Sequence, residues 1–479
     1  MVIHSPRVAE APVSDGVRRI RNLDPATGEL VAEIPVATEH EVDVAVSVAA
    51  DSAATWARCS PADRAAAVGR AAGRVRSDSE ELSRLTTTEM GRPAELARGG
   101  VEAAAATIAQ YAELGPLHRG RSLQGGWDAT DLMVHEPRGV VALLTPWNDP
   151  VAVPAGLLAA ALVTGNSVVF KPSERTPLTG QRLAHAFQAE LPPGVLTLVQ
   201  GDAETGAALA GHAGVDVVCH VGSTRAGRSI ARAAAGTGAK VLLENGGNDP
   251  LVVDADIDPT WAAAQAALGG FINSGQLCTA VERVHVHEAV AAEFLTALVA
   301  EAAALVIGPG SDPATTLGPL VDERARSEVH AQVHQARQAG ARVLTGGNVP
   351  DGPGAFYPAT VLTDVTFDMT VVTDETFGPV LPVMVAGSFE EALSAASRTS
   401  YGLAATVLTG SMRHAQDAWR RLPVGTVKVN AVFGGAPGGA AQPRGASGDG
   451  FGYGPELLDE LTRTKAVHLG QPRLRGGDG

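Results

Sequence analysis

Residues 139–150 read GVVALLTPWNDP, an unbroken apolar run that a proline ends and a polar turn follows. Strands of a parallel sheet have this character, because helices bury both faces of the sheet. Similar strands, with segments of helical composition between them, are expected at 166–171, 195–199, 215–221 and 251–254. Repeated β-α units predict a doubly wound α/β sheet.

A second series of such units follows residue 278. Its strands are expected at 283–286, 341–344, 380–385 and 426–430. Because 479 residues exceed one ordinary core, we expect two α/β domains. Upstream, 41–54 and 61–76 have helical composition, and Ser60 before Pro61 is typical of a helix start. Residues 434–454 form a Gly- and Pro-rich loop.

The composition argues against several classes of partner. A formal net charge of −15 without clustered Lys or Arg argues against nucleic acid. Cys59, Cys219 and Cys278 are too few and too scattered for a disulfide framework, and no residue group has metal-ligand spacing. No signal-like or membrane-spanning apolar run is seen. We expect a cytoplasmic protein without metal or membrane partner.

Two side chains are suited to covalent catalysis. Cys278 lies in the polar turn FINSGQLCTA (271–280), and Glu244 ends an apolar run in LLENGGND (242–249). A thiol can attack a substrate, and a carboxylate that is partly desolvated at a strand end can act as a base near neutral pH. In isolation, an inert buried thiol and a solvated Glu would be the simpler interpretations.

Two further motifs suit a dinucleotide. Lys171 and Glu174 of KPSE follow an expected strand and could hold two ribose hydroxyls, although a surface ion pair has the same spacing. GSTRAG (222–227) joins an expected strand to a helix, where backbone N–H groups and the Ser223 hydroxyl could bind a pyrophosphate. As an isolated Gly/Ser turn it would be weak evidence.

Together with TPWNDP (145–150) and ETFGPV (375–380), these motifs occur in an order that resembles the NAD(P)-dependent aldehyde dehydrogenase superfamily, over roughly residues 22–467. The resemblance implies a Rossmann-like dinucleotide-binding domain, an α/β catalytic domain and a small β oligomerisation arm. It also implies a homodimer or homotetramer in which the arm pairs with another subunit. The dinucleotide-binding domain is expected at 7–118 and 138–245, and the catalytic domain at 246–445. The oligomerisation arm is expected at 119–137 and 455–479.

By this resemblance, Cys278 attacks the aldehyde, while Asn148 and the Cys278 N–H stabilise the oxyanion and Glu244 activates water. Asn148 could instead be an ordinary turn residue before Pro150. NAD is favoured over NADP, because Glu174 would repel a 2′-phosphate. The residues expected at the cofactor are Thr145, Pro146, Trp147, Lys171, Ser173, Glu174, Gly201, Gly222, Ser223, Asn245, Gly246, Glu375 and Phe377.

The substrate side departs most from the family pattern. Asp149 stands where Phe or Tyr is common, and a wider, negatively charged tunnel would suit a bulky, polar or amino aldehyde. Alternatively, Asp149 turns away and pairs with an Arg such as Arg98 or Arg444. Asn245 stands where Leu is usual. The expected lining, with Phe433 as its one remaining aromatic, is Asp149, Val153, Gly156, Ile272, Leu277, Thr279 and Phe433.

Two other functions are compatible with the motifs. A CoA-acylating dehydrogenase would release the thioester to CoA, but such family members usually lack the base at Glu244. A catalytically idle NAD-binding homologue would keep the fold alone, whereas Cys278, Asn148, Glu244 and Glu375 are all present. Hydrolytic, NAD-dependent oxidation of an aldehyde to a carboxylic acid is therefore the expected activity.

Overall fold

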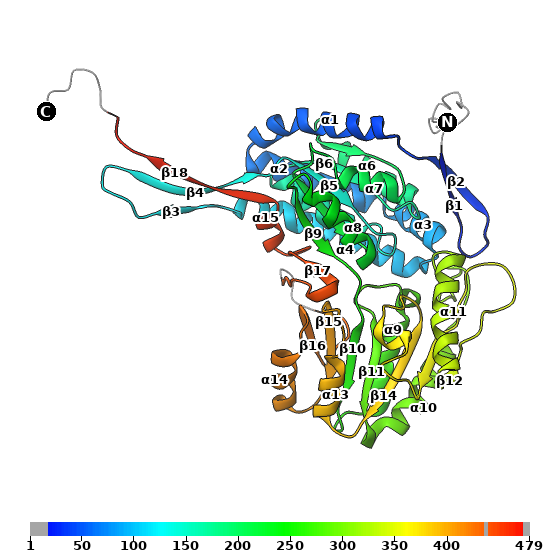
Figure 1. Cartoon of the computed structure of the whole chain (residues 1–479). Coiled ribbons are helices and arrows are strands. Elements are labelled where there is room, and N and C mark those ends of the chain that lie inside the picture. The colour runs from blue at the N-terminus through cyan, green and yellow to red at the C-terminus, as the bar shows by residue number, and fades with distance from the viewer. Residues whose placement is uncertain (1–17, 435–438, 473–479) are drawn as a thin grey trace.

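The computed structural model describes residues 18–434 and 439–472, so predictions that fall on 1–17, 435–438 and 473–479 lie outside the described residues. The described chain forms two α/β bodies, one above the other in Figure 1, and a β arm that projects from the upper body. The predicted α/β class is confirmed. Among the described helices, none is long and apolar enough to cross a membrane.

Six strands form the sheet of the upper body, in the spatial order β17-β9-β8-β5-β6-β7. The strands are β5 (Val140–Leu144), β6 (Ser167–Lys171), β7 (Leu196–Leu198), β8 (Val217–Val221), β9 (Lys240–Glu244) and β17 (Gly448–Asp449). All neighbours run parallel except β17 and β9. β5, β6 and β8 are buried along their whole length, which explains their continuous apolar runs.

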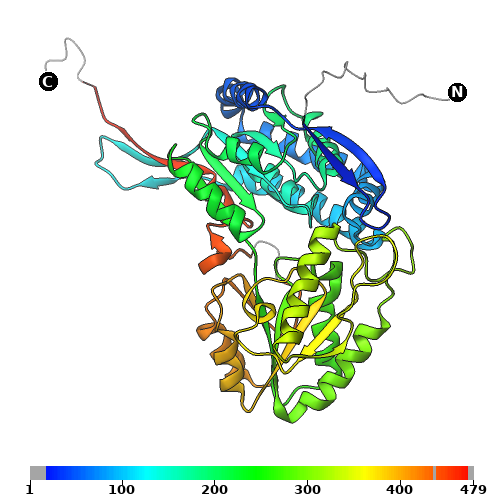
Figure 2. The same ribbon diagram turned by 45° about the vertical axis from the view of Figure 1, so that its right-hand side comes forward.

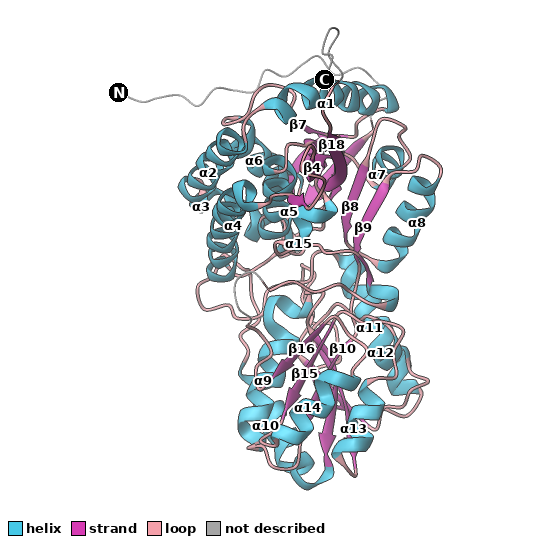
Figure 3. Cartoon of the chain, turned by 90° about the vertical axis from the view of Figure 1, so that its left-hand side faces the viewer, coloured by secondary structure: helices cyan, strands magenta, loops and turns pink. Residues whose placement is uncertain are grey.

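Helices cover both faces of this sheet, as Figure 3 shows. Along β5, Val141 and Leu143 face one helix layer, whereas Ala142 and Leu144 face the other. The Ser60 hydroxyl accepts the Asp63 N–H at 3.1 Å and caps the second helix, as predicted. One layer holds α2 (Pro61–Ser77), α3 (Ser79–Met90), α4 (Ala94–Leu114), α5 (Ala152–Val163) and α6 (Pro177–Gln188), and the other α1 (Glu39–Arg58), α7 (Ala203–Ala210) and α8 (Thr224–Ala235).

The lower body has a seven-stranded sheet in the order β12-β13-β14-β11-β10-β15-β16, in which only β12 is antiparallel to its neighbour. The strands are β10 (Asp249–Val253), β11 (Val281–His287), β12 (Arg342–Thr345), β13 (Thr360–Thr363), β14 (Val380–Ala386), β15 (Ala404–Leu408) and β16 (Thr426–Val429). The strand pattern of the sequence grouped 251–254 with the first sheet, and this was wrong, although the bounds 246–445 implied by the resemblance include this strand in the second domain. β10 pairs with β11 and β15, because the chain changes sheets directly after β9.

Helices also cover both faces of the lower sheet. α9 (Pro259–Phe271) and α10 (Glu288–Ala304) pack on one face, and α13 (Phe389–Ala396) and α14 (Met412–Arg421) pack on the other. α11 (Glu323–Gln338) and the short α12 (Thr370–Thr373) form a further cluster beside β13 and β14. An N-terminal hairpin, β1 (Arg19–Leu23) and β2 (Leu30–Pro35), reaches down to this body, where the Pro25 carbonyl accepts the Ala355 N–H at 2.7 Å.

The arm is an antiparallel sheet of three strands, β3 (Arg121–Leu123), β4 (Thr130–Pro137) and β18 (Thr462–Leu469), with β4 in the centre. Figures 1 and 2 both show it extending away from the two bodies. The arm joins segments far apart in the chain, because α15 (Glu456–Glu460) returns the C-terminal segment to the upper body before β18 begins. β18 leaves its outer edge unpaired within the described chain.

Candidate active site

The turn before the predicted nucleophile has an uncommon backbone conformation. After α9, the 3-10 turn η2 (Ile272–Gly275) places Asn273 and Ser274 at φ values of 51° and 57°. Such conformations persist where neighbouring contacts fix them. The Gln276 side chain supplies two such contacts. Its amide N–H donates to the Asn273 carbonyl (3.1 Å), and its Oε1 accepts the Val321 N–H (2.9 Å).

Asn148 connects this turn to the upper sheet. It follows β5 in the turn that also holds Thr145 and Pro146, and its Nδ2 donates to the Gln276 carbonyl at 3.0 Å. In return, Asn273 Nδ2 donates to the Asn148 carbonyl at 3.3 Å. A primary amide has two N–H groups, so the second of Asn148 is left to reach another acceptor. The structure thus brings the predicted oxyanion donor against the predicted nucleophile's turn.

Cys278 is partly exposed, as are Leu277 and Thr279 on either side of it. The thiol itself is closely surrounded, and desolvation raises its pKa well above the usual value. Nearby carboxylates add to this rise, and Glu244 contributes most among them. The Cys278 thiol is therefore protonated at neutral pH, and it would need a proton acceptor before it could act as a nucleophile.

Glu244 has the properties of such an acceptor. Burial raises the pKa of its carboxyl to about 7, and a backbone hydrogen bond from Gly452 partly opposes the rise. A methyl group on Gly452 would lie 2.2 Å from the Glu244 Cδ, so any larger residue there would have to displace the Glu244 carboxyl. Tyr111 holds the same loop, because its hydroxyl donates to the Gly454 carbonyl at 3.2 Å. Part of the Gly- and Pro-rich loop predicted at 434–454 thus lies against the predicted base.

On the predicted ribose side, Lys171 is buried at the end of β6. Its Nζ donates to the carbonyls of Pro172 (2.9 Å) and Gly201 (2.8 Å) and lies 4.0 Å from the Glu174 carboxylate. Glu174 is 44% exposed, and its Oε2 is 3.5 Å from the Ser173 hydroxyl. The ammonium is thus fixed, while the carboxylate beside it faces the open side.

The GSTRAG turn lies directly beside β9. Gly222 N–H donates to the Glu244 carbonyl at 3.0 Å, and the Ser223 hydroxyl caps α8 by accepting the Ala226 N–H at 3.3 Å. The first turn of α8 presents further backbone N–H groups and the positive end of the helix dipole, which suits a phosphate group.

Asn245 has a structural contact that its sequence position did not suggest. Its Nδ2 donates to the Ala446 carbonyl at 3.1 Å, and its backbone N–H donates to the Ser447 carbonyl at 2.8 Å. A methyl group on Gly227 would lie 2.0 Å from Asn245 Oδ1, so this side chain occupies the space that the glycine leaves. Asn245 therefore fastens the C-terminal loop, around η3 (Gly445–Ser447), to α8.

On the predicted nicotinamide side, Glu375 Oε1 accepts the Gly247 N–H at 3.0 Å, and a methyl group on Gly246 would lie 2.1 Å from the same carboxyl. Phe377, at φ 52°, meets the edge of the Trp147 ring at a centroid distance of 5.5 Å. Sequence reasoning missed Glu282, a buried carboxylate on β11 that accepts the N–H groups of Thr376 and Phe377 and so fixes this turn.

Asp149 adopts the second of the two predicted orientations. Its Oδ1 lies 3.5 Å from an Nη of Arg92 and accepts the Ala152 N–H at 3.2 Å. The partner is thus Arg92, which precedes α4, and neither Arg98 nor Arg444. A guanidinium that the sequence did not reveal therefore lies beside Asp149 and largely balances its charge.

The space beside Gly156 is smaller than its sequence position implied. A methyl group there would lie 3.4 Å from Thr107 Cγ2 and 3.9 Å from the Tyr111 ring, both on α4. Tyr111, a buried core residue, therefore lies beside Gly156. The other predicted lining residues, all partly exposed, are Val153, Ile272, Leu277, Thr279 and Phe433.

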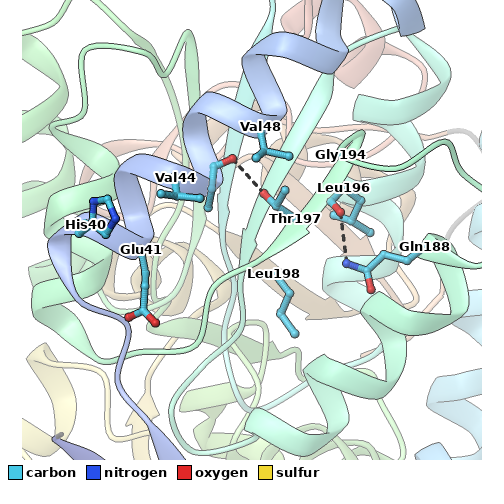
Figure 4. Close-up of a pocket in the computed structure, with 10 residues that line it drawn as sticks. His40, Glu41, Val44, Val48, Gln188, Gly194, Leu196, Thr197 and Leu198 are labelled. Atoms are coloured by element: carbon cyan, nitrogen blue, oxygen red, sulfur yellow. Dashed lines mark hydrogen bonds between the residues drawn. The ribbon is translucent and has the colours of Figure 1, made fainter. Parts of the chain in front are cut away.

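Two other features lie outside this site. An open hollow of about 460 Å³ lies between α1 and β7 and is lined by His40, Val44, Val48, Gln188 and Thr197, among others (Figure 4). At the root of the arm, His118, His135 and Asp459 bring one ligand atom each within 4.8 Å of one another. The fold creates this trio from distant segments, so residue spacing could not predict it.

Comparison with known proteins identifies the family. The model of the "Aldehyde dehydrogenase family" matches residues 13–467. The chain belongs to the aldehyde dehydrogenase family. It is accordingly an oxidoreductase that acts on aldehydes, and the family uses a nicotinamide cofactor.

Individual members of the aldehyde dehydrogenase family resemble the chain along nearly its whole length. It is 38% identical to 3,6-anhydro-alpha-L-galactose dehydrogenase of Streptomyces coelicolor (93% of this chain, 92% of that protein). It is 36% identical to betaine aldehyde dehydrogenase of Cereibacter sphaeroides, with the same coverage. A solved structure of 3,6-anhydro-L-galactose dehydrogenase in complex with NAP has a TM-score of 0.91 at 34% identity, covering 94% and 96% of the two chains.

Asp149→Asn should raise kcat/KM for carboxylate-bearing aldehydes relative to neutral ones of equal length. The amide keeps an acceptor for the Ala152 N–H but leaves the Arg92 guanidinium without its counter-charge. For a partly exposed pair we expect a change of roughly fivefold, about 1 kcal/mol. Arg98→Gln, on the exposed side of α4, serves as the control. An unchanged ranking of aldehydes in Asp149→Asn would show that the pair does not face substrate.

Proposed function

We propose that this aldehyde dehydrogenase oxidises a bulky, polar aldehyde to the carboxylic acid with NAD, using Cys278 as nucleophile and Glu244 as base. The observation that carries the proposal is the 3.0 Å hydrogen bond from Asn148 to the Gln276 carbonyl. It unites a donor from the upper sheet with the Cys278 turn from the lower body. Two sheets thus contribute to one reaction centre.

The residues divide the chemistry as follows. The Cys278 thiol loses its proton to Glu244, and its sulfur forms a bond to the aldehyde carbon. The carbonyl oxygen becomes an alkoxide, which the Asn148 amide and the Cys278 N–H stabilise. NAD, when bound, supplies the hydride acceptor that converts this adduct to a thioester. Glu244 releases the thiol proton to solvent and, as a carboxylate again, takes a proton from water. The water oxygen attacks the thioester carbon, and the carbon–sulfur bond breaks to release the carboxylic acid and the Cys278 thiolate.

Cys278→Ala should abolish NADH production. Glu244→Gln should still give a burst stoichiometric with enzyme, slower than that of the wild type, and then slow turnover, because the thiol and the water both lose their base. Wild-type turnover should rise with pH through about 7, where Glu244 becomes charged, and Glu244→Gln should lose that dependence. Stopped-flow absorbance of NADH measures both phases, with Cys59→Ala as the control. Steady turnover by Cys278→Ala, or acyl-CoA formation when CoA is added, would contradict the mechanism.

The preference for NAD is argued from the charges around Lys171. The Glu174 carboxylate lies 4.0 Å from the ammonium and can accept hydrogen bonds from ribose hydroxyls, but it would repel a 2′-phosphate. The neighbouring Arg175 cannot readily compensate, because it pairs with Asp322 at 3.0 Å and lies over the Trp147 ring. The similar 3,6-anhydro-L-galactose dehydrogenase was solved with NAP, so membership of the family does not decide this choice.

Wild-type enzyme should therefore have a higher kcat/KM with NAD than with NADP. Glu174→Ser should lower the ratio of these two kcat/KM values by about tenfold, because it removes the negative charge that would repel the 2′-phosphate of NADP. Arg175→Gln tests the alternative that the adjacent guanidinium binds a 2′-phosphate. A wild-type preference for NADP would overturn the assignment.

A polar substrate is supported by the predicted tunnel. The Arg92–Asp149 pair offers donors and acceptors with little net charge, and Thr107 and Thr279 add hydroxyl groups. A neutral aldehyde that carries hydroxyl groups could satisfy these side chains on entering, whereas an apolar aldehyde would leave them unpaired. An amino aldehyde could use Asp149 only at the expense of its bond to Arg92.

We also propose a homodimer or a dimer of two such dimers. β18 in the arm and β16 in the lower sheet both have an unpaired edge within the described chain, and both run for several residues. Trp127, at the turn of the arm, is fully exposed, and Leu123 and Leu469 are about half exposed. Exposed apolar side chains beside an open strand edge are typical of a surface that another subunit covers.

The outer edge of β18 can be tested with two prolines. In an antiparallel strand, adjacent residues direct their N–H groups to opposite edges, so one of Lys465 and Ala466 donates to β4 and the other outward. Proline at the outward position should yield monomers with little loss of Tm, and proline at the other should mainly lower Tm. Light scattering at micromolar concentration gives the mass. A monomeric wild type would contradict the proposal.

A further inference from the structure

His220 is a buried histidine at the end of β8 that the chemistry above does not use. It is 8% exposed, and neither ring nitrogen has a hydrogen-bond partner in the described structure. The carbonyls of Ser223 and Leu144 lie close enough to favour a protonated ring slightly, but neither accepts a hydrogen bond of good geometry. Buried polar atoms without partners are rare in proteins and call for an explanation.

Burial has a definite effect on this ring. Desolvation lowers its pKa to about 4, and the Lys171 ammonium contributes in the same direction. At neutral pH the imidazole is therefore uncharged, with one N–H donor and one acceptor nitrogen. An apolar ring of the same shape would avoid the cost of desolvating these two atoms, which is on the order of 1–3 kcal/mol for each unsatisfied group. Core packing alone does not explain a histidine here.

The surroundings of His220 indicate which ligand could use it. A methyl group on Gly222 would lie 2.8 Å from Cε1 and 3.0 Å from Nε2, so the ring edge lies directly under the first glycine of GSTRAG. The next residue, Ser223, caps α8 and begins the positive end of that helix. Lys171 lies close enough to influence the ring from β6. A cation, a helix N-terminus and an unused N–H together favour a phosphate.

We propose that His220 donates a ring N–H to a phosphate oxygen of the dinucleotide's diphosphate. The proposal rests on the function proposed above, because it requires a dinucleotide on the GSTRAG turn. It adds a residue that none of the family-like motifs pointed to. This role explains why the His220 ring nitrogens have no partner in the free protein. The free protein keeps a desolvated N–H donor that only the bound cofactor satisfies, which lowers the stability of the free protein and raises its affinity for the cofactor.

The test replaces His220 with Phe, which keeps a ring of similar size and removes both nitrogens. Calorimetric titration should show NAD and ADP binding at least about tenfold more weakly, the expected loss for a buried hydrogen bond to a charged group. Nicotinamide mononucleotide, which lacks the diphosphate bridge, should be affected much less. Without cofactor, the Tm of His220→Phe should equal or exceed that of the wild type, which a purely structural histidine would not show.

Cys219→Ala is the matched control, because Cys219 precedes His220 in β8, is equally buried and faces the opposite helix layer. It should lower Tm while leaving the Kd for NAD and ADP unchanged. His220→Phe with wild-type affinity for both ligands would overturn the role of His220. Absence of NAD binding by the wild type would instead overturn the cofactor assignment, so the two failures are distinguishable.

Discussion

The hydrogen bond from Asn148 to the Gln276 carbonyl is the contact on which the arrangement of the site depends. It joins a turn after β5 to a turn after α9, and these belong to different sheets. Each turn also has support from its own side: the buried strand β5 precedes the first, and the Gln276 side chain holds the second. Catalytic groups must be held close to their productive geometry, and hydrogen bonds and packing from neighbouring residues supply that constraint.

A second constraint is the number of buried carboxyl groups in and around the candidate site. Burial raises the pKa of Glu244 and Glu282 to about 7 and that of Glu375 to about 8. Few cations oppose them, so most are held by backbone N–H groups instead. Backbone donors do not titrate, so these hydrogen bonds are available whenever the carboxyl groups are charged.

Local patterns were sufficient to predict much of this structure. The continuous apolar runs indicated β5, β6 and β8. The resemblance to a known family singled out Cys278, Glu244 and Asn148, whose roles stay predictions. The failures share one cause, since each depends on segments distant in the sequence. No local signal could place β10 in the second sheet, choose Arg92 over Arg98 as the partner of Asp149, or show that Asn245 holds the C-terminal loop.

The position of Trp147 has an optical consequence. The chain has five tryptophans, of which Trp56 is buried in the core, while Trp127, Trp261 and Trp419 are exposed. Trp147 alone stands within the candidate site, with the Phe377 ring at its edge and the Arg175 guanidinium 5.3 Å from its centroid. Indole emission responds to nearby charge and to water. An intrinsic fluorophore therefore lies within the candidate site, where its emission should change when a ligand binds, without any attached label.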